Sequence, residues 1–308
     1  MEERLASLLN STHTGVNMID IKAENGKFVA YNNGSVIASS KNRDYLKRKV
    51  SAMIECSDII QPCLPSSEFA INDRFIFTEQ LVTMVATGAT ASCVITGEGG
   101  LGKTYSVIKA LKAAGLTDIT EFSVGDVVPT RKSFRVVKGF STAKGLYKIL
   151  YENKNSIIVF DDCDSVLKDP DALNLLKGAL DSYDKRIITW NTSITDDGLP
   201  RVFEFKGGVV FVSNMQADKI SQAIRSRSMN VDLSMTTDQK IERMETIMAT
   251  DEFMPGVSFN VKADALNVIR DNKNIAREIS LRTLINVAKI RNTGSANWKA
   301  LAKYMLVN

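Results

Sequence analysis

From about residue 66 onward, short apolar runs alternate with segments in which apolar residues recur every three or four positions. Such runs predict buried strands, and such spacing predicts helices with one buried face. The apolar runs lie at 91–96, 134–140, 156–160 and 209–212. Strands that alternate with helices form parallel sheets covered on both faces, so the expected fold class is α/β.

The first 65 residues follow a different pattern. Two β-forming runs, at 27–31 and 35–38, flank Asn32-Asn33-Gly34, and an Asn-Gly pair between such runs is a strong hairpin signal. The stretch 44–54 has helical spacing, and Pro62 and Pro65 mark a linker. We therefore expect a small α+β module over residues 1–65 that selects a partner.

After residue 233 the pattern is wholly helical. Thr236 and Gln239 form a capping box that begins the first helix. Further helices are predicted over 262–271, 280–291 and 296–306. The expected domains are thus an α/β core over residues 66–235 and a helical domain over 236–308.

Within the core, the segment after the first strand matches the phosphate-binding loop G-x-x-x-x-G-K-[ST] at every required position. Its residues are Gly97, Glu98, Gly99, Gly100, Leu101, Gly102, Lys103 and Thr104. A random match occurs in only about one in a hundred chains of this length, and here a strand precedes the loop and a helix follows it, as phosphate binding requires.

The residue types of this loop explain the expected chemistry. Glycines let backbone N–H groups turn toward phosphate oxygens, and the start of the next helix adds its positive dipole end. Lys103 is expected to bind the β- and γ-phosphates, and the Thr104 hydroxyl is expected to bind Mg²⁺. The loop therefore predicts a site for a nucleoside triphosphate with Mg²⁺.

Composition narrows the protein's class. The chain has 308 residues, 44% hydrophobic and 24% charged, and no apolar run of membrane-spanning length. We expect a cytoplasmic protein without a membrane partner. His13 is the only histidine, which argues against a histidine-based catalytic triad, and the net charge of +4 is too small to establish a nucleic-acid partner. The cysteines lack metal-site spacing and are expected to be reduced thiols: Cys56, Cys63, Cys93 and Cys163.

Polar residues follow two of the predicted strands. Asp161 and Asp162 end the run at 156–160, which is the Walker B pattern, and Asn214 follows the run at 209–212. In this order, the motifs resemble those of the AAA+ ATPases over about residues 66–308, including clamp-loader-like, helicase-loader-like and phage-encoded members. The resemblance implies a three-layer P-loop NTPase sandwich with a helical lid and ATP as the nucleotide.

The resemblance also implies roles for these polar residues. Asp161 would hold Mg²⁺ through water, Asn214 would be the sensor 1 residue, and Asp162 would occupy the position of the catalytic acid. That position is usually Glu, so Asp162 is a departure by one methylene. It could still deprotonate the attacking water in a slightly tighter site. A plain strand ending is the alternative for all three residues.

Two arginine segments complete the resemblance. Arg227, with Arg225 as the alternative, resembles the arginine finger that enters a neighbouring subunit's site. Arg282, with Arg277 as the alternative, resembles the sensor 2 arginine of the lid. A basic helix end and a surface arginine are the structural alternatives. A finger that acts across subunits implies a homo-oligomeric ring or partial ring.

Three activities remain open for such an ATPase. The first loads or remodels a DNA-bound complex, which the basic run 41–49 and a predicted hairpin, 187–190 with 202–205, support. The second remodels proteins, as chaperones and MoxR-like ATPases do, with Phe140 as a candidate pore residue. The third is a slow nucleotide-switched scaffold, which Asp162 permits. We find no N-K-x-D motif, L-S-G-G-Q signature or second helicase core.

Overall fold

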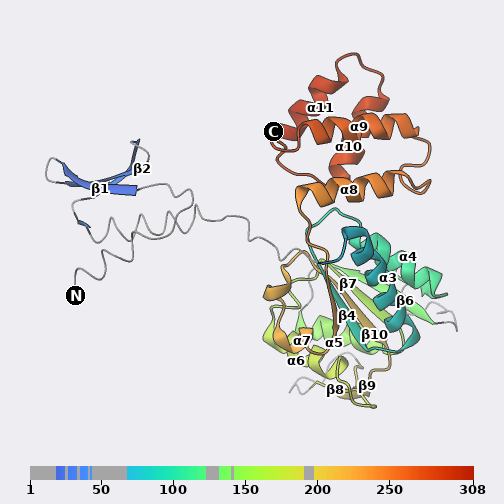
Figure 1. The fold of residues 1–308 in the computed structure, drawn as a ribbon. Helices are drawn as coiled ribbons and strands as arrows, with labels where there is room; N and C mark the ends of the chain where they lie inside the picture. The colour runs from blue at the N-terminus through green and yellow to red at the C-terminus, as the bar shows by residue number, and fades with distance from the viewer. Residues whose placement is uncertain are drawn as a thin grey trace. The chain divides into compact units, whose positions relative to one another are not determined.

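A computed structural model describes residues 19–24, 27–32, 35–40, 42–43, 68–122, 132–139, 142–190 and 198–308. The chain divides into two compact units, Met1–Ser66 and Ser67–Asn308. The first unit contains a three-stranded antiparallel sheet in the order β1-β2-β3 (Figure 1). Its strands are β1 (Ile19–Glu24), β2 (Lys27–Asn32) and β3 (Ser35–Ser40).

The hairpin expected around the Asn-Gly pair is thus present as β2 and β3, and β1 adds a strand that the pattern does not predict. The helix predicted over 44–54 and the linker at Pro62 and Pro65 lie outside the described residues. So does the basic run 41–49, apart from Asn42 and Arg43.

The second unit is built on a six-stranded sheet in the order β11-β4-β10-β7-β6-β5, with every neighbouring pair parallel. The strands are β4 (Ser92–Thr96), β5 (Thr117–Asp118), β6 (Ser133–Lys138), β7 (Ile157–Asp161), β10 (Gly208–Val212) and β11 (Met229–Asp232). The central strands β4, β7 and β10 are buried along their whole length, which explains their continuous apolar runs.

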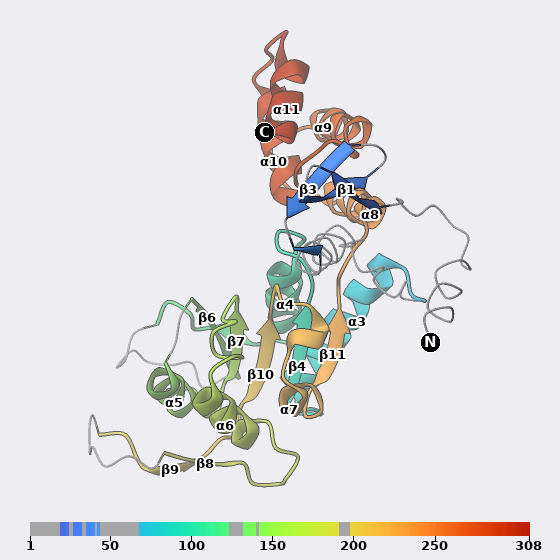
Figure 2. The same cartoon turned by 90° about the vertical axis from the view of Figure 1, so that its left-hand side faces the viewer.

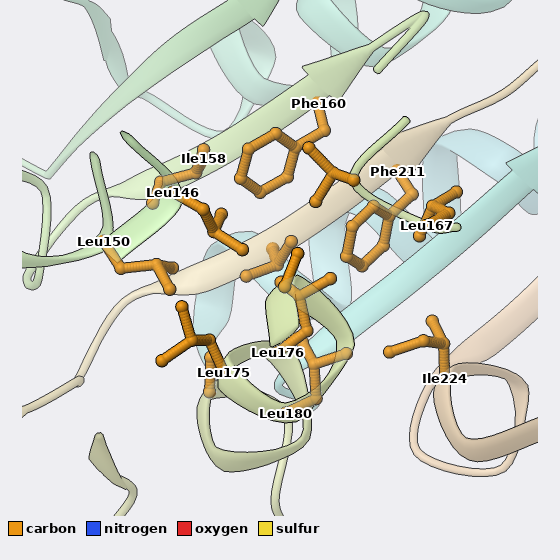
Figure 3. Close-up of a cluster of buried hydrophobic side chains, with 14 of the residues drawn as sticks. Leu146, Leu150, Ile158, Phe160, Leu167, Leu175, Leu176, Leu180, Phe211 and Ile224 are labelled. Carbon is orange, nitrogen blue, oxygen red and sulfur yellow. The ribbon is translucent and has the colours of Figure 1, made fainter. Parts of the chain in front are cut away.

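Helices cover both faces of this sheet (Figure 2). On one face lie α3 (Ile71–Thr87) and α4 (Lys103–Ala113), and on the other lie α5 (Ala143–Glu152) and α6 (Pro170–Ala179). The second face holds a core in which leucines of α5 and α6 pack on Phe160 and Phe211 (Figure 3). The fold is therefore the expected P-loop NTPase α/β sandwich.

The connection between α6 and β10 carries the predicted antiparallel hairpin, β8 (Ile187–Thr189) with β9 (Val202–Glu204). Between β10 and β11 lie a short 3₁₀ turn, η1 (Ala217–Lys219), and α7 (Gln222–Arg225).

The chain ends in the expected helical domain with its own apolar core. Its helices are α8 (Thr237–Met248), α9 (Phe259–Asp271), α10 (Leu281–Asn292) and α11 (Trp298–Val307). The capping box of Thr236 and Gln239 forms at the start of α8 as predicted. No helix in the described ranges is both long and apolar enough to span a bilayer.

Candidate nucleotide-binding site

The phosphate-binding loop joins the end of β4 to the start of α4. Three of its glycines have left-handed backbone angles, with φ of 130° at Gly97, 74° at Gly100 and 92° at Gly102. At Gly97 a side chain would also collide with the backbone, because an added Cβ would lie 2.8 Å from the carbonyl carbon of Leu233. The loop therefore needs glycine both for its turns and for close approach of the chain entering α8.

Lys103, the first residue of α4, points back into this loop. Its ammonium donates hydrogen bonds to the carbonyl oxygens of Gly97 and Glu98, each at 2.6 Å, and to Asn214 Oδ1 at 2.8 Å. Only 5% of the residue is exposed. Burial lowers the pKa of Lys103 to about 8, against the opposing effect of nearby carboxylates, of which Asp162 is the strongest.

Thr104, which follows Lys103 in the chain, lies against Asp161 at the end of β7. The Thr104 hydroxyl donates to Asp161 Oδ1 at 2.7 Å. The other oxygen of this buried carboxylate, Oδ2, forms an ion pair with Lys138 Nζ at 3.2 Å. Lys138 ends β6 directly beside Asp161 in the parallel register, which explains how the two side chains meet.

Asp162 and Asn214 form the third part of the site. β7 and β10 are neighbours, so the residues that follow them emerge side by side. Asn214 Nδ2 donates to Asp162 Oδ1 at 2.6 Å, while Asn214 Oδ1 accepts from Lys103. Asp162 has φ of 56°, a left-handed angle that Asp tolerates better than most residues and that is often found at functional sites.

The oxygen donors of this site fit Mg²⁺. A hydroxyl and a carboxylate that lie within hydrogen-bond distance of each other beside a phosphate loop are the ligand types that Mg²⁺ takes, with substrate phosphates and water completing its shell. No group of three or more His, Cys, Asp or Glu side chains that could hold a metal occurs in the part of the chain that the structure describes. Thr104 and Asp161 are thus the candidate protein ligands.

The helical domain contacts the loop directly. The backbone N–H of Leu281, the first residue of α10, donates to the Gly100 carbonyl at 2.9 Å. The Lys240 ammonium, on α8, forms an ion pair with the Glu98 carboxylate. Arg282 follows Leu281, and its Cδ would lie 3.8 Å from a Cβ added to Gly100.

The two candidate sensor 2 arginines have different surroundings. Arg277 donates through its backbone to Leu306 and through its guanidinium to the Asn308 carbonyl, which ties it to the end of α11. Arg282 instead lies beside the phosphate loop. Of the two, Arg282 is the one that the structure places next to this loop.

Arg227, the first candidate finger, lies at the other end of the sheet. The Arg227 carbonyl accepts from the Ser92 hydroxyl at 3.2 Å, at the start of β4, whereas the phosphate loop follows the end of this strand. A five-residue strand is about 16 Å long. Arg227 is exposed, so the structure separates it from the phosphate loop of the same chain. Arg225 is also exposed, but it lines a pocket with Thr96 and Asp232 towards the end of β4.

Two cations of the site, Lys138 and Lys240, are not predicted from the sequence. Lys138 ends a predicted strand beside the one that carries Asp161, so adjacent parallel strands could have suggested it. Lys240 meets Glu98 only through the folding of the helical domain onto the core, and no sequence signal marks it.

Comparisons with known proteins place the chain in a family. No protein-family model matches it. The crystal structure of NtrX from Brucella abortus in complex with ATP matches with a TM-score of 0.45 and 13% identity, over 80% of this chain and 56% of that chain, so the match spans little more than half of NtrX. An uncharacterised 36.7 kDa protein in the nrdC-mobD intergenic region of Enterobacteria phage T4 is 33% identical over 250 residues, covering 75% of this chain and 73% of that protein. The chain therefore belongs to the same protein family as this phage T4 protein.

Proposed function

We propose that this protein is an AAA+ ATPase that binds ATP with Mg²⁺ at the phosphate loop and hydrolyses it at subunit interfaces, in order to load or remodel a nucleic-acid-bound complex. One observation carries the ATPase part. Lys103, Thr104, Asp161, Asp162 and Asn214 converge where β4, β7 and β10 end, and hydrogen bonds join them into two neighbouring groups.

In this proposal each side chain has a separate task. When ATP binds, the Lys103 ammonium gives up its hydrogen bonds to the loop carbonyls and contacts phosphate oxygens. Their negative charge then balances the charge of the ammonium. Thr104 and Asp161 hold Mg²⁺, which supplies charge neutralisation on the phosphates when bound. Asp162 accepts a proton from the attacking water, and Asn214, hydrogen-bonded to both Lys103 and Asp162, orients that water.

The position of Arg227 supports hydrolysis between subunits. An exposed arginine at the opposite end of the sheet from the phosphate loop cannot reach the γ-phosphate bound by its own chain. It can complete the site of a neighbour packed head to tail. Such a heterologous contact generates a ring if it closes, and a helical or partial ring if it does not.

Surface chemistry near the β8–β9 hairpin favours a nucleic-acid partner. Tyr183 is 76% exposed and could stack on a base, and Ile187 and Val202 are exposed on the hairpin. A groove of about 550 Å³ opens beside it at the amino end of the sheet. Apart from Arg227, which this proposal assigns to a neighbouring subunit, its lining includes more cationic than acidic side chains: Lys132, Arg186 and Lys206 with Asp181. Phosphate groups would be attracted to this excess of positive charge.

A specific observation also favours a second candidate function, the slow nucleotide-switched scaffold. The Asp162 carboxylate is one methylene shorter than Glu, accepts a hydrogen bond from Asn214 and sits on a left-handed backbone. A carboxylate held in this way could deprotonate water slowly, as in a nucleotide-switched scaffold. For protein remodelling, the candidate pore residue Phe140 lies outside the described residues.

ATP turnover measured with single-stranded DNA, double-stranded DNA or an unfolded polypeptide tests this proposal. We expect DNA to stimulate turnover and the stimulation to fall steeply as salt rises, because phosphate contacts release counterions. Lys206→Glu should reduce the stimulation, whereas Lys303→Glu, an exposed change on α11, should not. Stimulation by polypeptide alone would contradict the nucleic-acid role, and ATP binding without turnover would favour the scaffold.

A further inference from the structure

The phosphate loop contains one acidic side chain, Glu98, and the helical domain neutralises it. Lys240, four residues after the cap of α8, forms an ion pair with the Glu98 carboxylate. The Lys240 side chain is only 15% exposed, while that of Glu98 is 53% exposed. The ammonium is thus held at the junction between the loop and the helical domain.

A second contact fixes the helical domain on the same loop. The Leu281 N–H binds the Gly100 carbonyl, and a Cβ on Gly100 would lie 3.1 Å from Ser280 Cβ. The starts of α8 and α10 therefore touch the loop on the two sides of Gly99. Lys240 can reach Glu98 only while this docking holds.

The charge of Glu98 opposes the expected ligand. Backbone N–H groups and the start of α4 attract phosphates, but a carboxylate in the loop repels them. At an effective dielectric constant of about 20, one unit charge about 8 Å from a phosphate changes affinity about thirtyfold, and salt reduces this effect. An ammonium paired with the carboxylate cancels most of it.

We propose that Lys240 is a positioning residue that neutralises Glu98, so that the phosphate loop accepts a triphosphate tightly only while the helical domain is docked on it. This inference rests on the proposed ATP binding. It makes docking of the helical domain and nucleotide binding thermodynamically linked, so each favours the other. The affinity then depends on the charge of the nucleotide in two ways, through the Glu98 carboxylate and through direct contacts to the phosphates.

Titration with fluorescent ATP and ADP analogues tests the proposal in four variants of the full chain. Lys240→Met keeps the side-chain length and removes the charge, and we expect it to weaken ATP binding about tenfold at low salt. The loss should be smaller for ADP, which carries less charge, and should shrink as salt rises. Glu98→Gln should bind ATP at least as tightly as the wild type.

The double variant Glu98→Gln/Lys240→Met separates charge from structure. With no carboxylate to neutralise, it should return to within about twofold of wild-type affinity, given the usual non-additivity of contacting residues. Lys273→Met removes the ion pair with Asp238 within the helical domain and serves as the matched control with unchanged affinity.

Two outcomes would overturn the inference while leaving ATP binding intact. In the first, Lys240→Met binds ATP as tightly as the wild type does. In the second, the double variant binds as weakly as Lys240→Met, and the loss is the same for ATP and ADP at every salt concentration. A wild-type protein that binds ATP no better than Lys103→Ala would instead contradict the proposed function, and the inference would fail with it.

Discussion

In the proposed function, the charge of Lys103 controls phosphate binding most directly. Its ammonium is buried and donates hydrogen bonds to two loop carbonyls and to Asn214. Burial lowers its pKa to about 8. The charge needed to hold a triphosphate is therefore lost at a lower pH than for an exposed lysine.

This lowered pKa predicts a pH dependence of binding. Below pH 8 the Lys103 ammonium is charged and can bind phosphate. Above pH 8 the side chain loses its proton in the free protein, so ATP binding requires uptake of a proton. ATP affinity should be flat from pH 6.5 to about 8 and then fall by roughly tenfold per pH unit. Calorimetric titration over this range measures the slope.

Lys103→Arg is the control, because a guanidinium stays charged over the whole range. The ATP affinity of this variant can be lower at every pH. It should not show the fall above pH 8 that the wild type shows. A wild-type affinity that stays constant up to pH 9.5 would contradict the role given to the buried ammonium.

At the residue scale, prediction from the sequence works where the chemistry is local. Residues 97–104 and the pair Asp161 and Asp162 are adjacent in sequence, so their pattern identifies them. Lys138 and Lys240 reach the site through packing between distant segments. In the proposed function Arg227 acts in a second copy of the chain, because within its own chain it lies beside the amino end of β4.

At the scale of elements, burial decides which strands the sequence predicts. β4, β7 and β10 are buried on both faces and read as apolar runs. β5 has two residues, and β11 at the other edge is half exposed, so neither has such a run. In α3 the buried face includes Arg74, whose guanidinium donates to the carbonyls of Asp232 and Ser234, and this interrupts the apolar spacing.

The contact between the phosphate loop and α10 predicts an unequal effect of two similar substitutions. Gly100 and Gly294 both have φ of 74°, but only Gly100 has a neighbour, Ser280, within 4 Å of an added Cβ. Gly294→Ala should lower the free energy of unfolding by about 1 kcal/mol through backbone strain alone. Gly100→Ala should lower it by about 2 kcal/mol, because Ser280 must also move.

Chemical denaturation of both variants measures the difference. Equal losses would mean that the helical domain does not rest on the phosphate loop in solution. A larger loss for Gly100→Ala, together with weaker ATP binding in that variant alone, is the expected result.

At the scale of the whole molecule, the two ends of the parallel sheet carry the two parts of the proposed shared site. The phosphate loop lies at the carboxyl end of the parallel sheet, and Arg227 lies beside the amino end of β4. Subunits arranged head to tail would bring the two ends together. The proposed hydrolysis therefore depends on a site that two copies of the chain share.

Mixing two inactive variants measures this shared site most directly. Lys103→Ala removes phosphate binding but keeps the finger, whereas Arg227→Ala keeps ATP binding but lacks the finger. Each variant alone should show almost no turnover. When the two are co-expressed, about a quarter of wild-type turnover should return, because random assembly places an intact loop beside an intact finger at about a quarter of the interfaces. Full turnover by Arg227→Ala alone, or a mixture no more active than the two variants measured separately, would contradict the account.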